Sequence, residues 1–203
     1  MAEVEENFLI IDCETTKHVF FHSPVTKSSS LTLVSNLLGI EHELIKYKGG
    51  FGFAEGDNVP EPVRDPRIVL HINSPGGLIS SAFMIADTIS NMTIPVDCVV
   101  DELAASAAVI IFLASENRSM LDHAELVFHE SIHGVDNVSF SDISDFAKGA
   151  KGIYDSMVDY YVDKLGMKPR DIRKLMKDNT TLSKAEAIKL GFVTSGLPEV
   201  SAS

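Results

Sequence analysis

The sequence predicts a layered α/β fold, because strand-like runs alternate with helical patterns along its 203 residues. Two buried strands are indicated by the β-branched runs at Ile68–Ile72 and Val96–Val100. A helical pattern follows each of them, first over Ser80–Ser90 and then over the apolar stretch Leu103–Ala114. This alternation is typical of domains in which helices are layered on a sheet.

The N-terminal third predicts one strand, one helix and one long loop. His18–Phe21 is the strand candidate, and Ser28–Ser30 can cap a helix that runs to about Ile45. The apolar stripe of this helix is expected to comprise Leu31, Val34, Leu37, Leu38 and Leu44. Residues 46–66 hold four glycines and three prolines, so no regular element is expected there. We therefore expect an inserted surface loop over residues 46–66.

The C-terminal part predicts a third strand and a long amphipathic helix. Leu126–Phe128 is the strand, and it ends at His129. The helix runs from Ser141 to Leu165, with an apolar side formed by Ile143, Phe146, Ile153, Met157 and Tyr160/Tyr161. No internal repeat or low-complexity tract is visible, and the length suits one core, so we expect a single domain over residues 1–203.

Composition excludes several classes of protein. The net charge of −12 argues against nonspecific nucleic-acid binding. The longest apolar run is about a dozen residues, which is too short to span a bilayer. Cys13 and Cys98 lack the spacing of a metal or redox motif, so we expect free thiols, no metal, no cofactor and a reducing compartment. The acidic N-terminus shows no signal or transit peptide, and we expect a cytoplasmic protein.

Ser106 is the lone hydroxyl group in the apolar stretch Leu103–Ala114. Upstream, the Pro75-Gly76-Gly77 turn ends a strand and opens a helix, and its glycines would let backbone N–H groups approach a developing oxyanion. Downstream, His129 follows a strand. A serine, a histidine and an N–H loop are the components of acyl transfer. The alternative is a buried helix that tolerates one serine bonded to its own backbone.

Short motifs in a fixed order resemble the ClpP family of self-compartmentalising serine peptidases. They are Ile72-Asn73-Ser74-Pro75-Gly76-Gly77, Ala104-Ala105-Ser106, the hydrophobic pair Val127-Phe128 followed by His129, and Leu182-Ser183-x-x-Glu186-Ala187-x-x-x-Gly191-Phe192-Val193. The resemblance covers residues 67–195, about two thirds of the chain. It implies one α/β domain of the crotonase-like (ClpP) fold, with a protruding strand–helix handle at about residues 131–165. It also implies subunits that form heptameric rings, stacked in pairs around an inner chamber.

The resemblance assigns a role to four residues. Ser106 would be the nucleophile and His129 the general base, because an imidazole titrates near neutral pH. The N–H groups of Gly77 and Ala107 would form the oxyanion hole. The family usually has Met-Gly after the serine, whereas this chain has Ala107-Ala108, which keeps a backbone donor and alters the adjoining pocket.

The third catalytic position departs from the family. Four residues before Ser183 the family has aspartate, and this chain has Asn179, preceded by Asp178. Asn179 could hold the imidazole through its side-chain oxygen without supplying a charge. Alternatively, a shifted loop could bring Asp178 to His129, which requires a bulge or another loop path. Reduced activity is expected if Asn179 is the third residue.

These observations predict a serine endopeptidase subunit that cleaves unfolded polypeptides inside a ring assembly. No Walker motif is present, so ATP dependence would come from a separate AAA+ unfoldase (Clp ATPase) partner. One alternative is a ring subunit with little or no turnover and a structural or regulatory role. Another is an acyl-CoA enzyme of the crotonase fold, although such enzymes rely on acidic residues and oxyanion loops rather than on a Ser/His pair.

Overall fold

The computed structural model describes residues 8–13, 16–49, 66–130 and 140–196. Its strands are β1 (Phe8–Cys13), β2 (Thr16–Phe21), β3 (Arg67–Ser74), β4 (Val96–Ala105), β5 (Arg118–Met120), β6 (Glu125–Val127) and β7 (Thr181–Ser183). Its helices are α1 (Lys27–Gly49), α2 (Ile79–Asn91), α3 (Ala107–Phe112), α4 (Phe140–Leu165), α5 (Pro169–Lys177) and α6 (Lys184–Lys189). This mixed architecture confirms the α/β fold class.

The strands form one sheet in the order β1-β2-β3-β4-β6-β7, and β5 also pairs with β4. The central pairs β2–β3, β3–β4 and β4–β6 are parallel, whereas the outer pairs β1–β2 and β6–β7 are antiparallel. β4 is long enough to pair with β5 through its first half and with β6 through its second half. The carboxyl ends of β3, β4 and β6 therefore lie close together, at the edge where parallel strands of α/β sheets carry their binding sites.

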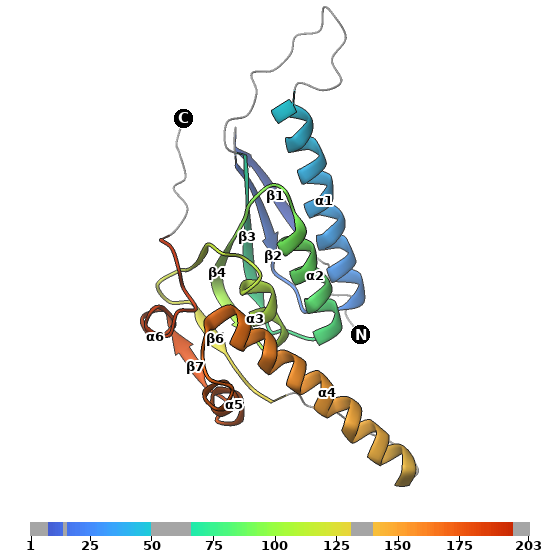
Figure 1. Ribbon diagram of the computed structural model, residues 1–203. Helices are drawn as coiled ribbons and strands as arrows, with labels where there is room; N and C mark the ends of the chain where they lie inside the picture. The colour runs from blue at the N-terminus through green and yellow to red at the C-terminus, as the bar shows by residue number, and fades with distance from the viewer. Residues whose placement is uncertain (1–7, 14–15, 50–65, 131–139, 197–203) are drawn as a thin grey trace, which may run out of the picture.

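Helices cover one face of the sheet and form the core with it. Figure 1 shows α1 and α2 side by side on this face, with α3 next to α2. Ile68, Leu70 and Ile72 of β3 point into this core, because alternate residues of a strand face the same side. Such a continuous apolar layer accounts for the stability of the sheet.

The opposite face of the sheet carries paired polar side chains. Arg67 of β3 contacts Asp97 of β4 at 2.7 Å, and His71 Nδ1 lies 2.8 Å from Asp101 Oδ1. His22 lies 2.9 Å from the other oxygen of Asp101. Burial raises the pKa of Asp101, but the hydrogen bonds with His71 and His22 outweigh this effect and hold the pKa of the carboxyl below its ordinary value.

The predicted strands and helices exist, with different ends. The strand predicted at His18–Phe21 is β2, those predicted at Ile68–Ile72 and Val96–Val100 are β3 and β4, and the helix predicted at Ser80–Ser90 is α2. The helix predicted at Ser141–Leu165 is α4, which projects away from the sheet at its N-terminal end (Figure 1). On this helix Met157 and Tyr161 are buried, whereas the predicted apolar residues Phe146 and Ile153 are exposed.

The N-terminal helix corrects two expectations. Thr26 caps α1, because its Oγ1 accepts from the Ser29 N–H at 3.0 Å while Ser29 Oγ accepts from the Thr26 N–H at 2.9 Å. The cap expected at Ser28–Ser30 is therefore displaced, and the helix continues to Gly49 into the segment expected to be irregular. Residues 50–65 of the loop expected over residues 46–66 lie outside the described residues.

The buried stripe of α1 also differs from the predicted one. Its buried apolar residues are Leu33, Leu37, Ile40 and Leu44, whereas the predicted Leu31 and Leu38 are 62% and 47% exposed. The predicted stripe combined residues from two sides of the helix, and only one side packs on the sheet. None of the helices in the described ranges is both long and apolar enough to cross a membrane.

Candidate active site

Ser106 occupies a sharp turn between a strand and a helix. β4 ends at Ala105 and α3 begins at Ala107, so Ser106 stands at the start of a helix, and the alternative of a continuous buried helix over Leu103–Ala114 is wrong. Its backbone has φ 54° and ψ −120°, a conformation that L-residues rarely adopt and that costs about 1–3 kcal/mol. The Ser106 N–H donates to the Val127 carbonyl at 2.8 Å, and the Ser106 carbonyl accepts from the Val109 N–H at 3.0 Å. Bonds to β6 and to α3 therefore hold the turn.

Gly76 lets the loop after β3 pack directly on this turn. A Cβ at this position would lie 2.4 Å from the Ala105 carbonyl oxygen and 2.9 Å from Ser106 Cβ, and the φ of Gly76 is +87°. The Gly76 N–H donates to Ser74 Oγ at 3.2 Å. Glycine is therefore required at this position both by the space available and by the backbone conformation.

Two backbone N–H groups near Ser106 remain available as donors. The loop is held to residue 25, because the Val25 N–H donates to the Gly76 carbonyl and the Leu78 N–H donates to the Val25 carbonyl, both at 2.8 Å. Within the described part of the chain, neither the Gly77 N–H nor the Ala107 N–H has a hydrogen-bond acceptor. Ala107 is also the first residue of α3, where N–H groups are free and the local dipole favours negative charge.

His129 follows β6 and has its Nδ1 atom 2.8 Å from the Glu130 carbonyl oxygen. A carbonyl oxygen can only accept, so Nδ1 carries the proton and Nε2 is left as the basic nitrogen. No hydrogen bond joins His129 to Ser106 in the described residues. Catalytic hydrogen bonds are often long in proteins without substrate and tighten when substrate binds.

Asn179 ends helix α5 in a left-handed conformation, with φ 49°. The Thr180 N–H donates to the Leu175 carbonyl at 3.1 Å, and the Asn179 N–H donates to the Met176 carbonyl at 3.3 Å. This pair of bonds is a Schellman motif, in which asparagine is the usual alternative to glycine. Asn179 therefore has a structural role as the residue that terminates the helix.

The β6–β7 pairing bears on the choice between Asn179 and Asp178. Val127 pairs with Thr181, and the Phe128 N–H donates to the Thr180 carbonyl at 2.8 Å. Counted on by two residues, this antiparallel register points to Asn179 as the residue opposite His129, although β7 itself begins only at Thr181. Asp178 instead lines a separate hollow with Lys174 of α5 and with Met167, Asp171, Leu175, Thr180 and Leu190. Neither Asn179 nor Asp178 forms a hydrogen bond with His129 in the described residues.

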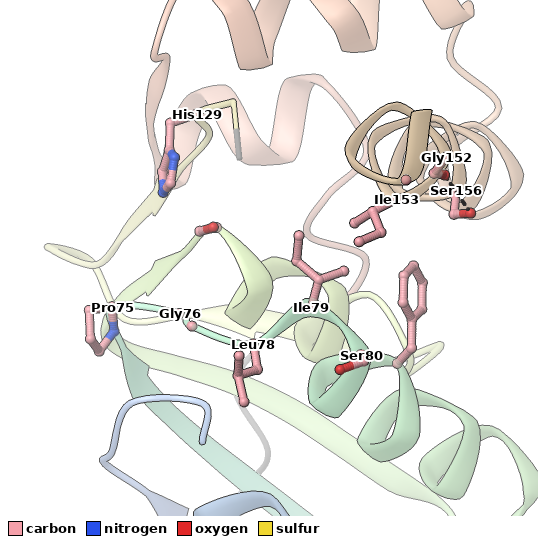
Figure 2. Close-up of a pocket in the computed structure, with 13 residues that line it drawn as sticks. Pro75, Gly76, Leu78, Ile79, Ser80, His129, Gly152, Ile153 and Ser156 are labelled. Atoms are coloured by element: carbon pink, nitrogen blue, oxygen red, sulfur yellow. Dashed lines mark hydrogen bonds between the residues drawn. The ribbon is translucent and has the colours of Figure 1, made fainter. Parts of the chain in front are cut away.

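A cavity of about 900 Å³ brings Ser106 and His129 together. The loop after β3 and the start of α2 supply one wall, comprising Pro75, Gly76, Gly77, Leu78, Ile79, Ser80 and Phe83. α4 supplies Gly149, Gly152, Ile153 and Ser156. Figure 2 shows His129 at one end of the cavity and Gly152 and Ile153 of α4 at the other. Asn179 and Asp178 are not among the residues that line it.

Neither the contribution of α4 to this cavity nor the close contact of Gly76 with Ser106 could be predicted from the sequence. The sequence contains no local signal that α4 lies beside the turn at Ser106. Gly149 and Gly152 are the one feature that could have drawn attention to α4, because two glycines so close together are unusual inside a helix. Within the described ranges, no group of three or more histidine, cysteine, aspartate or glutamate residues could hold a metal ion.

Comparisons with known proteins agree on one family. The sequence profile of the Clp protease family matches residues 62–197. The chain is 29% identical over 180 residues to proteolytic subunit 1 of the ATP-dependent Clp protease of Chlamydia abortus, covering 87% of this chain and 84% of that protein. It is 30% identical over 161 residues to the subunit of the same name from Chlamydia pneumoniae, covering 77% and 73% of the two chains.

A solved structure has the same fold. An asparagine-to-aspartate mutant of ClpP1 from Listeria monocytogenes superposes with a TM-score of 0.72 at 20% sequence identity. The superposition covers 90% of this chain and 92% of that chain. The crotonase-like (ClpP) fold expected from the motifs is therefore confirmed.

Proposed function

Because the chain belongs to the Clp protease family and is similar to its proteolytic subunits, we propose that it is a serine endopeptidase that cleaves unfolded polypeptides through an acyl-enzyme. The observation that carries this proposal is the turn at Ser106. The serine shares one cavity with His129, and two N–H groups without acceptors in the described chain lie in the adjoining turns at Gly77 and Ala107. These are the components that acyl transfer requires.

In the proposed mechanism Ser106 Oγ attacks the carbonyl carbon of the scissile bond. His129 Nε2 takes the serine proton and transfers it to the leaving amine, and water then hydrolyses the acyl-enzyme. The Gly77 and Ala107 N–H groups donate to the oxyanion of each tetrahedral intermediate. Loss of one such donor lowers the rate by about 10²–10³-fold in serine proteases.

We propose Asn179 as the third residue. Its side-chain oxygen would accept a hydrogen bond from His129 Nδ1–H. This requires the present hydrogen bond from Nδ1–H to the Glu130 carbonyl to break first. The β6–β7 register supports Asn179 over Asp178, because counting it on from Val127 and Thr181 by two residues pairs position 179 with position 129. Asparagine would fix the tautomer of the imidazole without stabilising the imidazolium by a full charge.

We further propose a single peptidase domain that self-associates into heptameric rings, stacked in pairs, with residues 131–165 as the handle between them. Substrates would be delivered by a Clp-type AAA+ unfoldase, since the chain has no Walker motif of its own. The similar chlamydial proteins are named as subunits of an ATP-dependent protease, which supports this partnership. A cytoplasmic location would keep the buried thiol of Cys98 reduced.

Labelling with a fluorophosphonate tests the nucleophile directly. This probe forms a covalent bond with an activated serine and not with an ordinary one, so mass spectrometry of the labelled protein should place the adduct on Ser106. The Ser106→Ala variant should take up no label. An adduct elsewhere, or no adduct in an assembled protein, would contradict the proposed role.

A second candidate function is that of a ring subunit with little turnover. It is favoured by the geometry at His129, whose Nδ1 is bonded to a neutral backbone carbonyl, and by the neutral side chain at position 179. Single-turnover and steady-state measurements on one peptide separate the two functions. Labelling of Ser106 combined with negligible steady-state cleavage would support the second candidate.

A further inference from the structure

A break in the register between β3 and β4 lies directly before the serine turn. Asn73 of β3 stands alone opposite the three residues 101–103 of β4. Extra residues of this kind form a bulge, which bends a strand and redirects the residues that follow. β4 changes its partner at this point, because its pairing with β5 ends at Val100 and its pairing with β6 begins at Leu103. The bulge therefore sets the direction in which β4 reaches Ser106.

Polar side chains, rather than apolar packing, hold this bulge. β4 is buried before and after the bulge, whereas Asp101 is half-buried and Glu102 is exposed. Both residues are bonded to the neighbouring strand. The His71 Nδ1–H group donates to Asp101 Oδ1 at 2.8 Å, and Asn73 Nδ2 donates to Glu102 Oε2 at 2.9 Å.

Asp101 joins three strands through its two carboxylate oxygens. Oδ1 accepts from His71 of β3, and Oδ2 accepts at 2.9 Å from Nε2–H of His22, which directly follows β2. The pKa of this carboxyl lies below its ordinary value despite its burial, so Asp101 is ionised and can only accept. On the other side of the neutral His71 ring, Nε2 accepts from His18 Nδ1–H at 3.0 Å. Phe20 stacks on the same ring, with 4.3 Å between the centroids, so the orientation of His71 is fixed.

The three strands joined by Asp101 lead to the three parts of the candidate active site. β2 leads through His22 to Val25, whose backbone binds the loop after β3. β3 leads to Gly77 of that loop, and β4 leads through Asp101 to Ser106. A shift of one strand relative to the others would change the distance between the serine oxygen and the N–H donors, on which stabilisation of an oxyanion depends.

We infer that Asp101, together with His71 and His22, is a positioning group that holds Ser106 in place relative to the N–H donor of Gly77. None of the three side chains lines the cavity, so they act through the serine turn and not on the substrate. Loss of the group should lower kcat more than it changes KM, because a displacement of about 1 Å between reacting groups can cost about 10²-fold in rate. This inference rests on the proposed function and adds residues that act through Ser106.

An amide in place of the carboxylate makes the contact dependent on pH. In Asp101→Asn the amide oxygen can still accept from His71, but the amide N–H can donate to His22 only while that imidazole is neutral. This contact is lost as the pH falls from about 8 to about 6, where imidazoles gain a proton. The parent carboxylate accepts from His22 in both states. The other charged or titratable side chains of the described residues on this face of the three strands are His18, Arg67, Asp97 and Glu102.

The test measures kcat, KM and fluorophosphonate labelling of Ser106 at pH 8 and at pH 6. Asp101→Ala should lower kcat about 10–100-fold at pH 8, with KM changed by less than about threefold. Asp101→Asn should keep kcat within about threefold of the parent at pH 8 and lose about tenfold more than the parent at pH 6. Protonation of His129 affects parent and variants alike, so it cancels when their ratios of kcat at the two pH values are compared.

Asp97→Asn is the matched control, because Asp97 lies on the same strand and face, pairs with Arg67 of β3 at 2.7 Å and precedes the bulge. It should keep the ratio of the parent. An unchanged ratio for Asp101→Asn, in a parent that labels normally, would overturn the inference and leave the proposed function standing. An equal loss in the control would also overturn it, since any change on this face would then act alike.

Thermal unfolding and sedimentation are measured on every variant at both pH values. If Asp101→Ala fails to fold, the ratio for Asp101→Asn alone decides. Loss of assembly by Asp101→Asn at pH 6, in conditions where the parent stays assembled, would overturn the inference, because the group would then act between copies of the chain. Absence of labelling and cleavage in the parent would overturn the proposed function and the inference together.

Discussion

At the scale of single residues, the candidate site contains two non-glycine residues with positive φ angles, Ser106 and Asn179. Ser106 has a φ of 54° because the chain must turn from β4 into α3 within one residue. Gly76 supports this turn by close packing, and Asn179 has a φ of 49° because it terminates α5. Such conformations persist only where the surrounding structure stabilises them, and they concentrate at functional sites.

Ser106→Ala should reduce kcat/KM for peptide cleavage by at least roughly 10³-fold, because the attacking oxygen is removed. The fold should survive, since alanine fits the same space and the bonds to Val127 and Val109 involve only the backbone. Peptide cleavage and thermal unfolding measure the two effects. Cleavage at the parent rate would make Ser106 a packing residue and would remove the basis of the proposed mechanism.

Asn179→Asp should raise kcat/KM by one or two powers of ten, which corresponds to about 1.4–2.7 kcal/mol of transition-state stabilisation. The reason is that a carboxylate opposite His129 would stabilise the imidazolium. Aspartate, like asparagine, adopts the left-handed conformation, so the end of α5 should be preserved. Steady-state kinetics of the purified variant give the result.

Two control variants separate the catalytic role of Asn179 from its structural role. Asn179→Gly keeps the helix end without the amide and should lower activity if the side chain orients His129. Asp178→Ala should leave the chemistry unchanged, because Asp178 lines another hollow. If Asp178→Ala eliminates turnover in an intact assembly while Asn179→Asp changes nothing, Asp178 is the third residue.

The sequence allowed Ser106 and His129 to be proposed because motif order and spacing are local signals. The third position stayed open between Asn179 and Asp178, since the relation of a helix end to a strand depends on the β6–β7 register. The role of Gly76 was not predicted in detail because it depends on the contact between the β3 loop and the β4–α3 turn. Tertiary contacts of this kind leave no periodic pattern in the sequence.

At the scale of elements, the long β4 strand explains why the helix boundary was misplaced. Leu103–Ala105 has the same apolar composition as the helix that follows, and it pairs with β6. Composition alone cannot separate a buried strand from a buried helix. The short strands β5 and β7 were missed for a related reason, since three residues are too few to show alternation.

Helix α4 offers a prediction about stability. Gly149→Ala should raise the free energy of unfolding by about 1 kcal/mol, because alanine favours a helix and its Cβ meets no described atom within 4 Å. For a domain of this size, that gain corresponds to a rise in Tm of about 2–4 °C. Differential scanning calorimetry measures the shift.

Gly39→Ala on α1 should give a similar increase in Tm, because Gly39 is equally free of contacts in the described residues. A fall in Tm for Gly149→Ala alone would show that its Cβ meets a neighbour in the assembled protein. In that case the wall of the cavity would be partly formed by another copy of the chain.

At the scale of the whole molecule, a buried arginine of β5 binds the segment that directly follows α6. Arg118 of β5 donates to the carbonyls of Phe192, Ser115 and Gly191 at 2.8, 2.6 and 3.2 Å. Burial lowers the pKa of Arg118, and these carbonyls satisfy its N–H groups. No local pattern in the sequence indicates this contact between distant residues. The match to the Clp protease family, over residues 62–197, includes Arg118 and all three of its partners.

The proposed ring assembly leads to a prediction about salt. Each chain carries a net charge of −12, so copies of it repel one another at low ionic strength. Raising the salt concentration to about 0.15 M shortens the Debye length to about 8 Å and should shift the population toward rings. Native mass spectrometry and sedimentation should then show seven or fourteen subunits. Ser106→Ala should behave in the same way, because its change removes one oxygen inside the cavity and leaves the charge unaltered. A population of only monomers or dimers across ordinary salt and protein concentrations would contradict the proposed assembly.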